Sequence, residues 1–190
     1  MTPVMYSDPS GEFAILATIL ITTLVGAALG FSISLGKQLY DNEFNFEGVN
    51  WKEVGISTLL GAAVGAAYGL GATAGAIIAG KAAIASLTVS QSFVLLGSSA
   101  GLINFTAGVV AYNIRNTGND NFNYGEMFLS GIGQAGKGLV AFGAGTFLGS
   151  TGFWKPGNIS NIGSRVISKQ VMLFTPNYYF DSYLSFDGRW

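Results

Sequence analysis

Residues 61–75 read GAAVGAAYGLGATAG, and this stretch decides the fold because its glycines recur at helical spacing. Residues four apart lie on the same face of a helix. Small residues at that spacing let two helix backbones approach closely, as in helices that pack within a membrane. We therefore predict a helix-packing role for the glycines with this spacing, which are Gly26 and Gly30, Gly61, Gly65 and Gly69, Gly71 and Gly75, and Gly97 and Gly101.

The composition also favours a membrane. The chain has 190 residues, of which 49% are hydrophobic and 10% are charged, against roughly 25% charged in an average soluble domain. Three stretches carry no charge, namely residues 13–36, 54–80 and 82–114. At 1.5 Å per residue the first would reach about 36 Å, longer than the ~30 Å hydrocarbon core of a bilayer. The rival interpretation is close helix packing in a soluble all-α core.

Charge and residue content exclude several functions. The net charge is −1 and the basic residues are scattered, so nucleic acid is not an expected partner. The absence of cysteine and histidine removes disulfides, thiol nucleophiles and imidazole bases, and with them most zinc sites. We therefore predict no enzyme activity, no cofactor and no metal. Asp41, Glu43 and Glu47 could hold a hard cation, but a solvated loop is favoured because their spacing does not match an EF-hand.

Local signals predict where the uncharged stretches begin and end. Asp8 as an N-cap, followed by Pro9, predicts the start of the first helix, and Gly36 before Lys37 predicts its end. The third uncharged stretch is too long for one typical span. A glycine and serine cluster at 97–101 predicts a break there, which would give two short helices or a re-entrant hairpin.

Two similar helix starts indicate an internal duplication. Asn50 and Glu53 have the N-cap and N3 positions of a capping box, and Asn123 and Glu126 repeat them 73 residues later. Helix capping explains these residues better than a role as loop ligands. Each copy opens a helix rich in glycine and alanine, the first to Gly80 and the second to about residue 150. Chance similarity within a biased composition is the rival to duplication.

The first residues carry a resemblance to a known family. Residues 2–13, TPVMYSDPSGEF, and above all Asp8, Pro9, Ser10 and Gly11, resemble the end of the core of Rhs or YD-repeat proteins. In that family a β-repeat shell precedes the motif and a variable toxin follows it. The resemblance implies that this chain is a carboxy-terminal tip detached from its shell. Thr2 stands where the family usually has asparagine, and the upstream repeats are absent.

These observations predict three regions and a function. Residues 1–12 end the Rhs-like motif, residues 13–150 form mainly α, glycine-rich and alanine-rich helical hairpins, and residues 151–190 form an aromatic, loop-rich tail. The leading hypothesis is a non-enzymatic, membrane-inserting toxin tip, either a translocation segment or a pore, located in a membrane or secreted within a larger toxin. The alternative is a soluble helical linker or scaffold packed inside the Rhs shell. The expected partners are the bilayer, the Rhs shell, an immunity protein and further copies of the chain.

Overall fold

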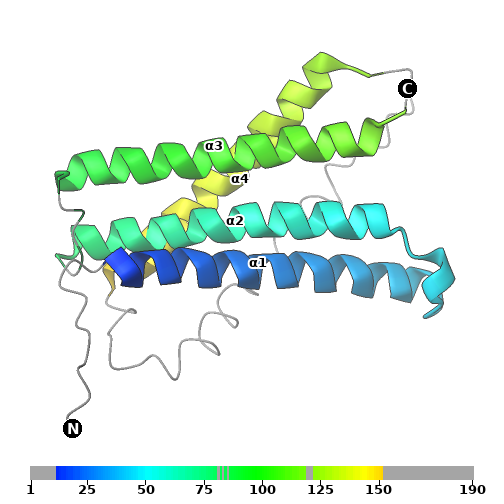
Figure 1. The fold of residues 1–190 in the computed structure, drawn as a ribbon, viewed down its shortest axis with the longest axis horizontal. Helices are drawn as coiled ribbons and strands as arrows, with labels where there is room; N and C mark the ends of the chain where they lie inside the picture. Colours follow the sequence, from blue (N-terminus) through cyan, green and yellow to red (C-terminus); the bar gives the residue numbers. More distant parts are fainter. Residues whose placement is uncertain (1–11, 81, 83, 85, 119–121, 152–190) are drawn as a thin grey trace, which may run out of the picture.

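The described part of the chain is a bundle of four long helices (Figure 1). The computed structural model describes residues 12–80, 82, 84, 86–118 and 122–151. None of these residues lies in a strand, which confirms the predicted mainly α fold. The elements are α1 (Glu12–Asp41), the short 3-10 helix η1 (Phe46–Gly48), α2 (Trp51–Ile78), α3 (Val89–Asn116) and α4 (Tyr124–Ser150).

Helix α2 is the centre of the bundle, because it packs against α1, α3 and α4. Figure 1 shows α1, α2 and α3 side by side, with α4 crossing them obliquely. Most residues from 61 to 77 are buried, and the majority of them are glycine or alanine. A helix with so few large apolar residues has little affinity for lipid by itself. Its position inside the bundle supplies the partner helices that it needs.

The two predicted helix starts are formed as expected. The Asn50 side chain accepts a hydrogen bond from the Glu53 N–H at 3.2 Å, and the Asn123 side chain accepts from the Gly125 and Glu126 N–H groups. The Asn50 N–H donates to Gln38 Oε1 at 2.6 Å. In a full capping box this N–H would instead donate to the Glu53 carboxylate. Glu53 instead forms an ion pair with α3.

Helix α1 does not end at Gly36, and this prediction is wrong. The helix continues through Lys37 to Asp41. A glycine within a helix costs about 1 kcal/mol, too little to stop a helix whose next turn has partners. Those partners are present, because Ser34 is buried and Gln38 bonds to the Asn50 N–H of α2. The chain turns only beyond Asp41, where Glu43 and Phe44 adopt positive φ.

The predicted break at residues 97–101 is also wrong, because α3 is continuous from Val89 to Asn116. Ala100 is fully buried, and the Ser98 hydroxyl donates to the Leu95 carbonyl oxygen of the preceding turn at 3.0 Å. The chain breaks earlier, after Gly80, whose φ is +67°. Thr88 then opens α3 with a reciprocal capping box to Gln91, a Thr-x-x-Gln pattern that is visible in the sequence.

The two asparagine caps can be tested with matched variants. We expect Asn50→Ala or Asn123→Ala to lower the free energy of unfolding by about 0.5 to 2 kcal/mol, because each leaves helix N–H groups without an acceptor. Asn50→Asp and Asn123→Asp keep an acceptor and should be nearly neutral. Amide hydrogen exchange in the first turns of α2 and α4 measures the effect. Equal protection in the alanine and aspartate variants would disprove the capping role.

Candidate functional site: the glycine interfaces of α2

Helix α2 presents glycine on two different faces. Successive residues of a helix are about 100° apart, so Gly69 and Gly71 lie about 200° apart around the axis. The face with Gly61, Gly65 and Gly69 contacts α1, and the face with Gly71 and Gly75 contacts α4. The change of phase between Gly69 and Gly71 therefore lets one helix receive two neighbours at close range.

At the α1–α2 interface, backbone meets backbone. A Cβ atom built on Gly61 would overlap the Gly26 carbonyl oxygen, and one built on Gly26 would overlap the Gly61 carbonyl oxygen. The glycine Cα–H bonds point at these oxygens, a contact worth about 0.5–1 kcal/mol each. The facing residues step by four in opposite directions, as antiparallel helices require. They are Gly30 with Ser57, Gly26 with Gly61, Thr22 with Gly65, and Ile19 with Gly69.

The α2–α4 interface is equally close, but its helices run in the same direction. A Cβ atom on Gly71 would overlap the Phe142 carbonyl oxygen, and one on Gly75 would lie 2.7 Å from the Ser150 nitrogen and 2.9 Å from the Gly149 Cα. The facing residues rise together by four along both helices, which is the register of a parallel pair. They are Tyr68 with Gly145, Gly71 with Phe142, Ala72 with Gly149, and Gly75 with Thr146.

The contacts between α2 and α4 are symmetric, because interchanging the two helices reproduces the same pairs of residue types. Residues 67–75, AYGLGATAG, align with residues 141–149, AFGAGTFLG, at a shift of 74. Under that shift the contact of Gly71 with Phe142 becomes the contact of Gly145 with Tyr68. Both copies thus share an aromatic-x-x-Gly-small-x-x-Gly motif, and each motif packs on the other about a pseudo-two-fold axis. The duplication stays a prediction from sequence, to which this symmetry adds geometric support.

Gly97 and Gly101 lie on α3 and face side chains of α4. A Cβ atom on Gly97 would lie 3.4 Å from the Phe142 ring, and one on Gly101 would lie 3.7 Å from Leu139 Cδ2, both ordinary contact distances. These two glycines are therefore in the α3–α4 interface without a close backbone approach. Phe142 also packs edge-on against Phe93, with ring centroids 5.3 Å apart.

Several close-packed glycines were missing from the predicted set, although the same spacing rule reaches some of them. Gly145 and Gly149 of α4 are four residues apart, as are Gly71 and Gly75 of α2. Both pairs lie in the α2–α4 interface. Gly108 on α3 packs against Ser130 and Gln134 of α4. It has no glycine four residues before or after it, so the spacing rule does not find it. The remaining close glycines of the α3–α4 interface are Gly131, against Phe105, and Gly138, against Asn104.

The polar residues inside the bundle bond mainly to helix backbone. Thr22 is fully buried and donates to the carbonyl oxygens of Thr18 and Ile19, at 2.9 and 3.0 Å. Asn104 Nδ2 donates to Ala63 O and to Ala100 O, both at 3.0 Å, so this side chain ties α3 to α2. Its Oδ1 atom is buried without a protein partner. Such interhelical bonds add about 0.6 kcal/mol on average in a membrane protein.

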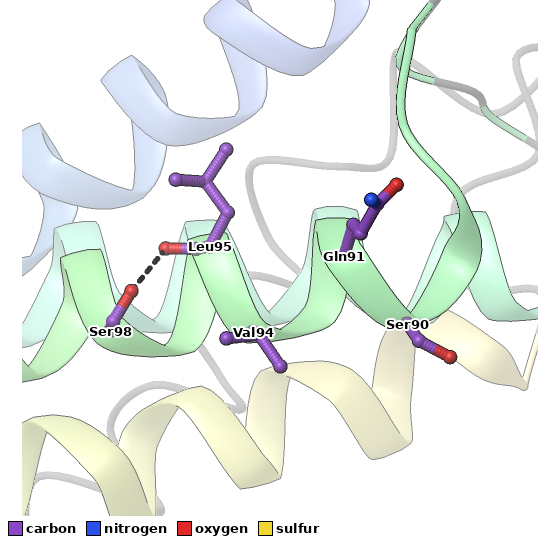
Figure 2. Close-up of a pocket in the computed structure, with 5 residues that line it drawn as sticks. All are labelled: Ser90, Gln91, Val94, Leu95 and Ser98. Carbon is purple, nitrogen blue, oxygen red and sulfur yellow. Dashed lines mark hydrogen bonds between the residues drawn. The ribbon is translucent and has the colours of Figure 1, made fainter.

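One surface hollow among the described residues is lined by uncharged side chains. This open hollow of about 410 Å³ lies along one side of α3. Figure 2 shows the residues that line it, which are Ser90, Gln91, Val94, Leu95 and Ser98. None of these side chains is charged, and the Ser98 hydroxyl is bonded to the Leu95 carbonyl oxygen. Within 12–80, 82, 84, 86–118 and 122–151, no three acidic residues gather as a metal site would require. Asp41 is the last residue of α1, Glu43 lies in the turn that follows, and Glu47 lies in η1, so the three do not share the single loop that was predicted.

The residues of the Rhs-like motif, Asp8, Pro9, Ser10 and Gly11, lie outside the described part of the chain, as do residues 152–190 of the aromatic tail. Comparison with protein-family models, with curated proteins and with solved structures found no match to this chain. The helices themselves are therefore the features from which a function can be inferred. By length and composition, three of them could cross a membrane, namely α1 over Ile15–Asp41, α2 and α3.

The close interfaces predict opposite effects for two glycines of the same helix. We expect Gly65→Ala to destabilise the bundle by about 1–3 kcal/mol, because the new methyl group would overlap the Thr22 carbonyl oxygen. Gly55→Ala, also in α2, has open space around it and should stabilise by about 0.5–1 kcal/mol. On α4, Gly145→Ala and Gly143→Ala form the same contrast.

Unfolding of the four variants by a denaturing detergent, followed by circular dichroism, measures these effects. Equal shifts within each pair would mean that the glycines reflect composition and that the backbones are not in close contact.

Proposed function

We propose that this protein is a non-enzymatic, membrane-inserting helical bundle, and that it serves as the translocation segment or pore of an Rhs-type polymorphic toxin. The observation that carries the proposal is the distribution of side chains across the bundle. Many large apolar side chains are exposed on the outside of the bundle, whereas glycine and alanine make up most of its interior, with fewer large side chains such as Tyr68 and Phe142. That is the reverse of a water-soluble bundle and the arrangement that lipid favours.

The outward apolar surface extends over three helices. Leu20 and Leu24 on α1, Leu102 on α3, and Val140 and Phe147 on α4 are each between 58% and 69% exposed. A soluble monomer rarely exposes contiguous apolar patches beyond a few hundred Å². In lipid the same side chains lose nothing by exposure, since acyl chains are as apolar as leucine. This surface supports insertion of the bundle as it is folded here.

The rival function, a soluble linker packed inside an Rhs shell, needs a polar stripe on the outside of its helices. In the first uncharged stretch, the residues that could form such a stripe are Thr18, Thr22 and Thr23. Thr22 is buried against α2, and Thr22 and Thr23 both donate to carbonyl oxygens of their own helix. Threonine bonded in this way is compatible with lipid. The arrangement therefore favours the membrane over the shell interior.

The toxin part of the proposal has a separate basis, which is the resemblance of residues 2–13 to the end of an Rhs core. It is tested by the DNA that flanks the gene. YD repeats in the same reading frame upstream, with a small membrane protein gene downstream as an immunity candidate, would support it. Flanking genes without either feature would leave a membrane bundle with no toxin assignment.

A charged substitution on the outer surface distinguishes a surface that faces lipid from one that faces water. We expect Leu102→Lys to prevent stable insertion, because lysine at the centre of a membrane helix costs about 2.5–3.5 kcal/mol. Asp41→Lys, at the charged end of α1, should insert normally. Both positions are exposed, so in a soluble protein neither change would matter.

Flotation of liposomes after release of a solubility tag measures the insertion of each variant. The parent protein and Asp41→Lys should float, and Leu102→Lys should not. Parent protein that stays soluble and monomeric at the bottom of the gradient would reject membrane insertion.

A further inference from the structure

One end of the bundle differs in chemistry from the rest. Apart from Glu12 and Lys137, every charged residue in the described ranges lies at the end where α1 joins α2 and α3 joins α4. Figure 1 shows both connections at the same end of the bundle. The charged residues there are Lys37, Asp41, Glu43, Glu47, Lys52, Glu53, Arg115 and Glu126.

The two connections at this end are joined to each other. Arg115 Nε and Nη2 donate to the two carboxylate oxygens of Glu53, both at 3.0 Å, which is a bidentate pair between α3 and α2. Lys52 Nζ donates to the Arg115 carbonyl oxygen at 3.1 Å. Tyr112 donates to Glu126 Oε2 at 3.1 Å and ties the end of α3 to the start of α4. These bonds make the end of the bundle one surface.

Aromatic side chains project from this surface. Trp51, which is 56% exposed, opens α2, and Phe44 and Phe46 lie in the turn before it. Glu43 and Phe44 hold left-handed φ angles of 52° and 63°, which residues other than glycine rarely adopt. The members of this aromatic set, each at least 56% exposed, are Tyr40, Phe44, Phe46, Trp51 and Tyr124.

The position of this set matches the edge of a bilayer. Residues 54–78 of α2 carry no charge and reach about 38 Å, and residues 13–36 of α1 reach about 36 Å. A ~30 Å hydrocarbon core centred on these stretches places Lys37, Lys52 and the aromatic set at the level of the lipid headgroups. Tryptophan and tyrosine are enriched at that level, because their rings are apolar and their polar groups reach water.

We propose that this end is an interfacial anchor, in which Tyr40, Phe44, Phe46, Trp51 and Tyr124 lie among lipid headgroups and set the depth and tilt of the inserted bundle. The inference rests on the proposed membrane insertion and adds the orientation of the protein within it. The ligand is the headgroup region of a phospholipid bilayer. The ion pair of Arg115 with Glu53 holds the two halves of the anchor at one depth.

The fluorescence of Trp51 can report how deeply this residue lies in a bilayer. In the double variant Trp154→Phe and Trp190→Phe it is the one remaining tryptophan. We expect its fluorescence in phosphatidylcholine liposomes to be quenched more by lipids brominated near the headgroup than by lipids brominated near the chain ends. A matched control carries Trp51→Phe and Leu102→Trp in the same background. Leu102 lies midway along α3 and is 66% exposed, so its quenching should show the opposite order.

The outcomes separate the anchor from the insertion. Liposomes that float with the protein, while Trp51 is quenched most by the deep bromines or by neither lipid, would disprove the anchor and leave membrane insertion intact. Protein that fails to float would remove both. Replacing Arg115 with Gln should broaden the depth of Trp51, seen as a smaller ratio of shallow to deep quenching. An unchanged ratio would show that the ion pair does not hold the anchor together.

Discussion

The close approach of α2 to α1 and to α4, with backbone against backbone, is the contact on which the rest of the bundle depends. In water, apolar side chains between helices would drive such packing, but in lipid that drive is lost and contact distance becomes decisive. At Gly61 and Gly71 the hydrogen atom in place of a side chain lets a facing carbonyl oxygen approach the Cα. A larger residue at Gly61 would push α1 away from α2, and a larger residue at Gly71 would push α4 away, because each glycine faces one of these two helices.

Much of this arrangement could be predicted from sequence, because glycine spacing and uncharged length are local properties. The start of α2 and of α4 followed from Asn50 and Asn123, whose caps need only the first turn of each helix. The predicted helix ends were wrong because helix ends also depend on contacts with residues that are distant in the sequence. Gly36 and the 97–101 cluster look like helix breaks, but contacts with distant residues outweigh the cost of about 1 kcal/mol per glycine. Which neighbour each glycine faces also depends on those distant contacts.

No single alignment shift relates the whole of α2 to the whole of α4. The matching helix starts align at a shift of 73, whereas the packed motifs of residues 67–75 and 141–149 align at 74. One residue turns a helix face by about 100°, so the first shift would have assigned the wrong residues to the interface. The contacts of Gly71 with Phe142 and of Tyr68 with Gly145 identify the shift that the packing uses. A duplicated hairpin whose copies meet in parallel would produce this pseudo-symmetry.

Helix α4 shows why the second glycine interface matters in a membrane. Lys137 lies near the middle of α4, whereas α1 and α3 carry no charge along their central spans. In the insertion proposed above, a lysine at the centre of a helix would cost about 2.5–3.5 kcal/mol if it faced lipid. Helix α4 would then rely on its neighbours in the bundle more than α1 or α3 does. Because Gly71, Gly75, Gly145 and Gly149 bring α4 against α2, loss of that interface would weaken the insertion of α4 before that of α1 and α2.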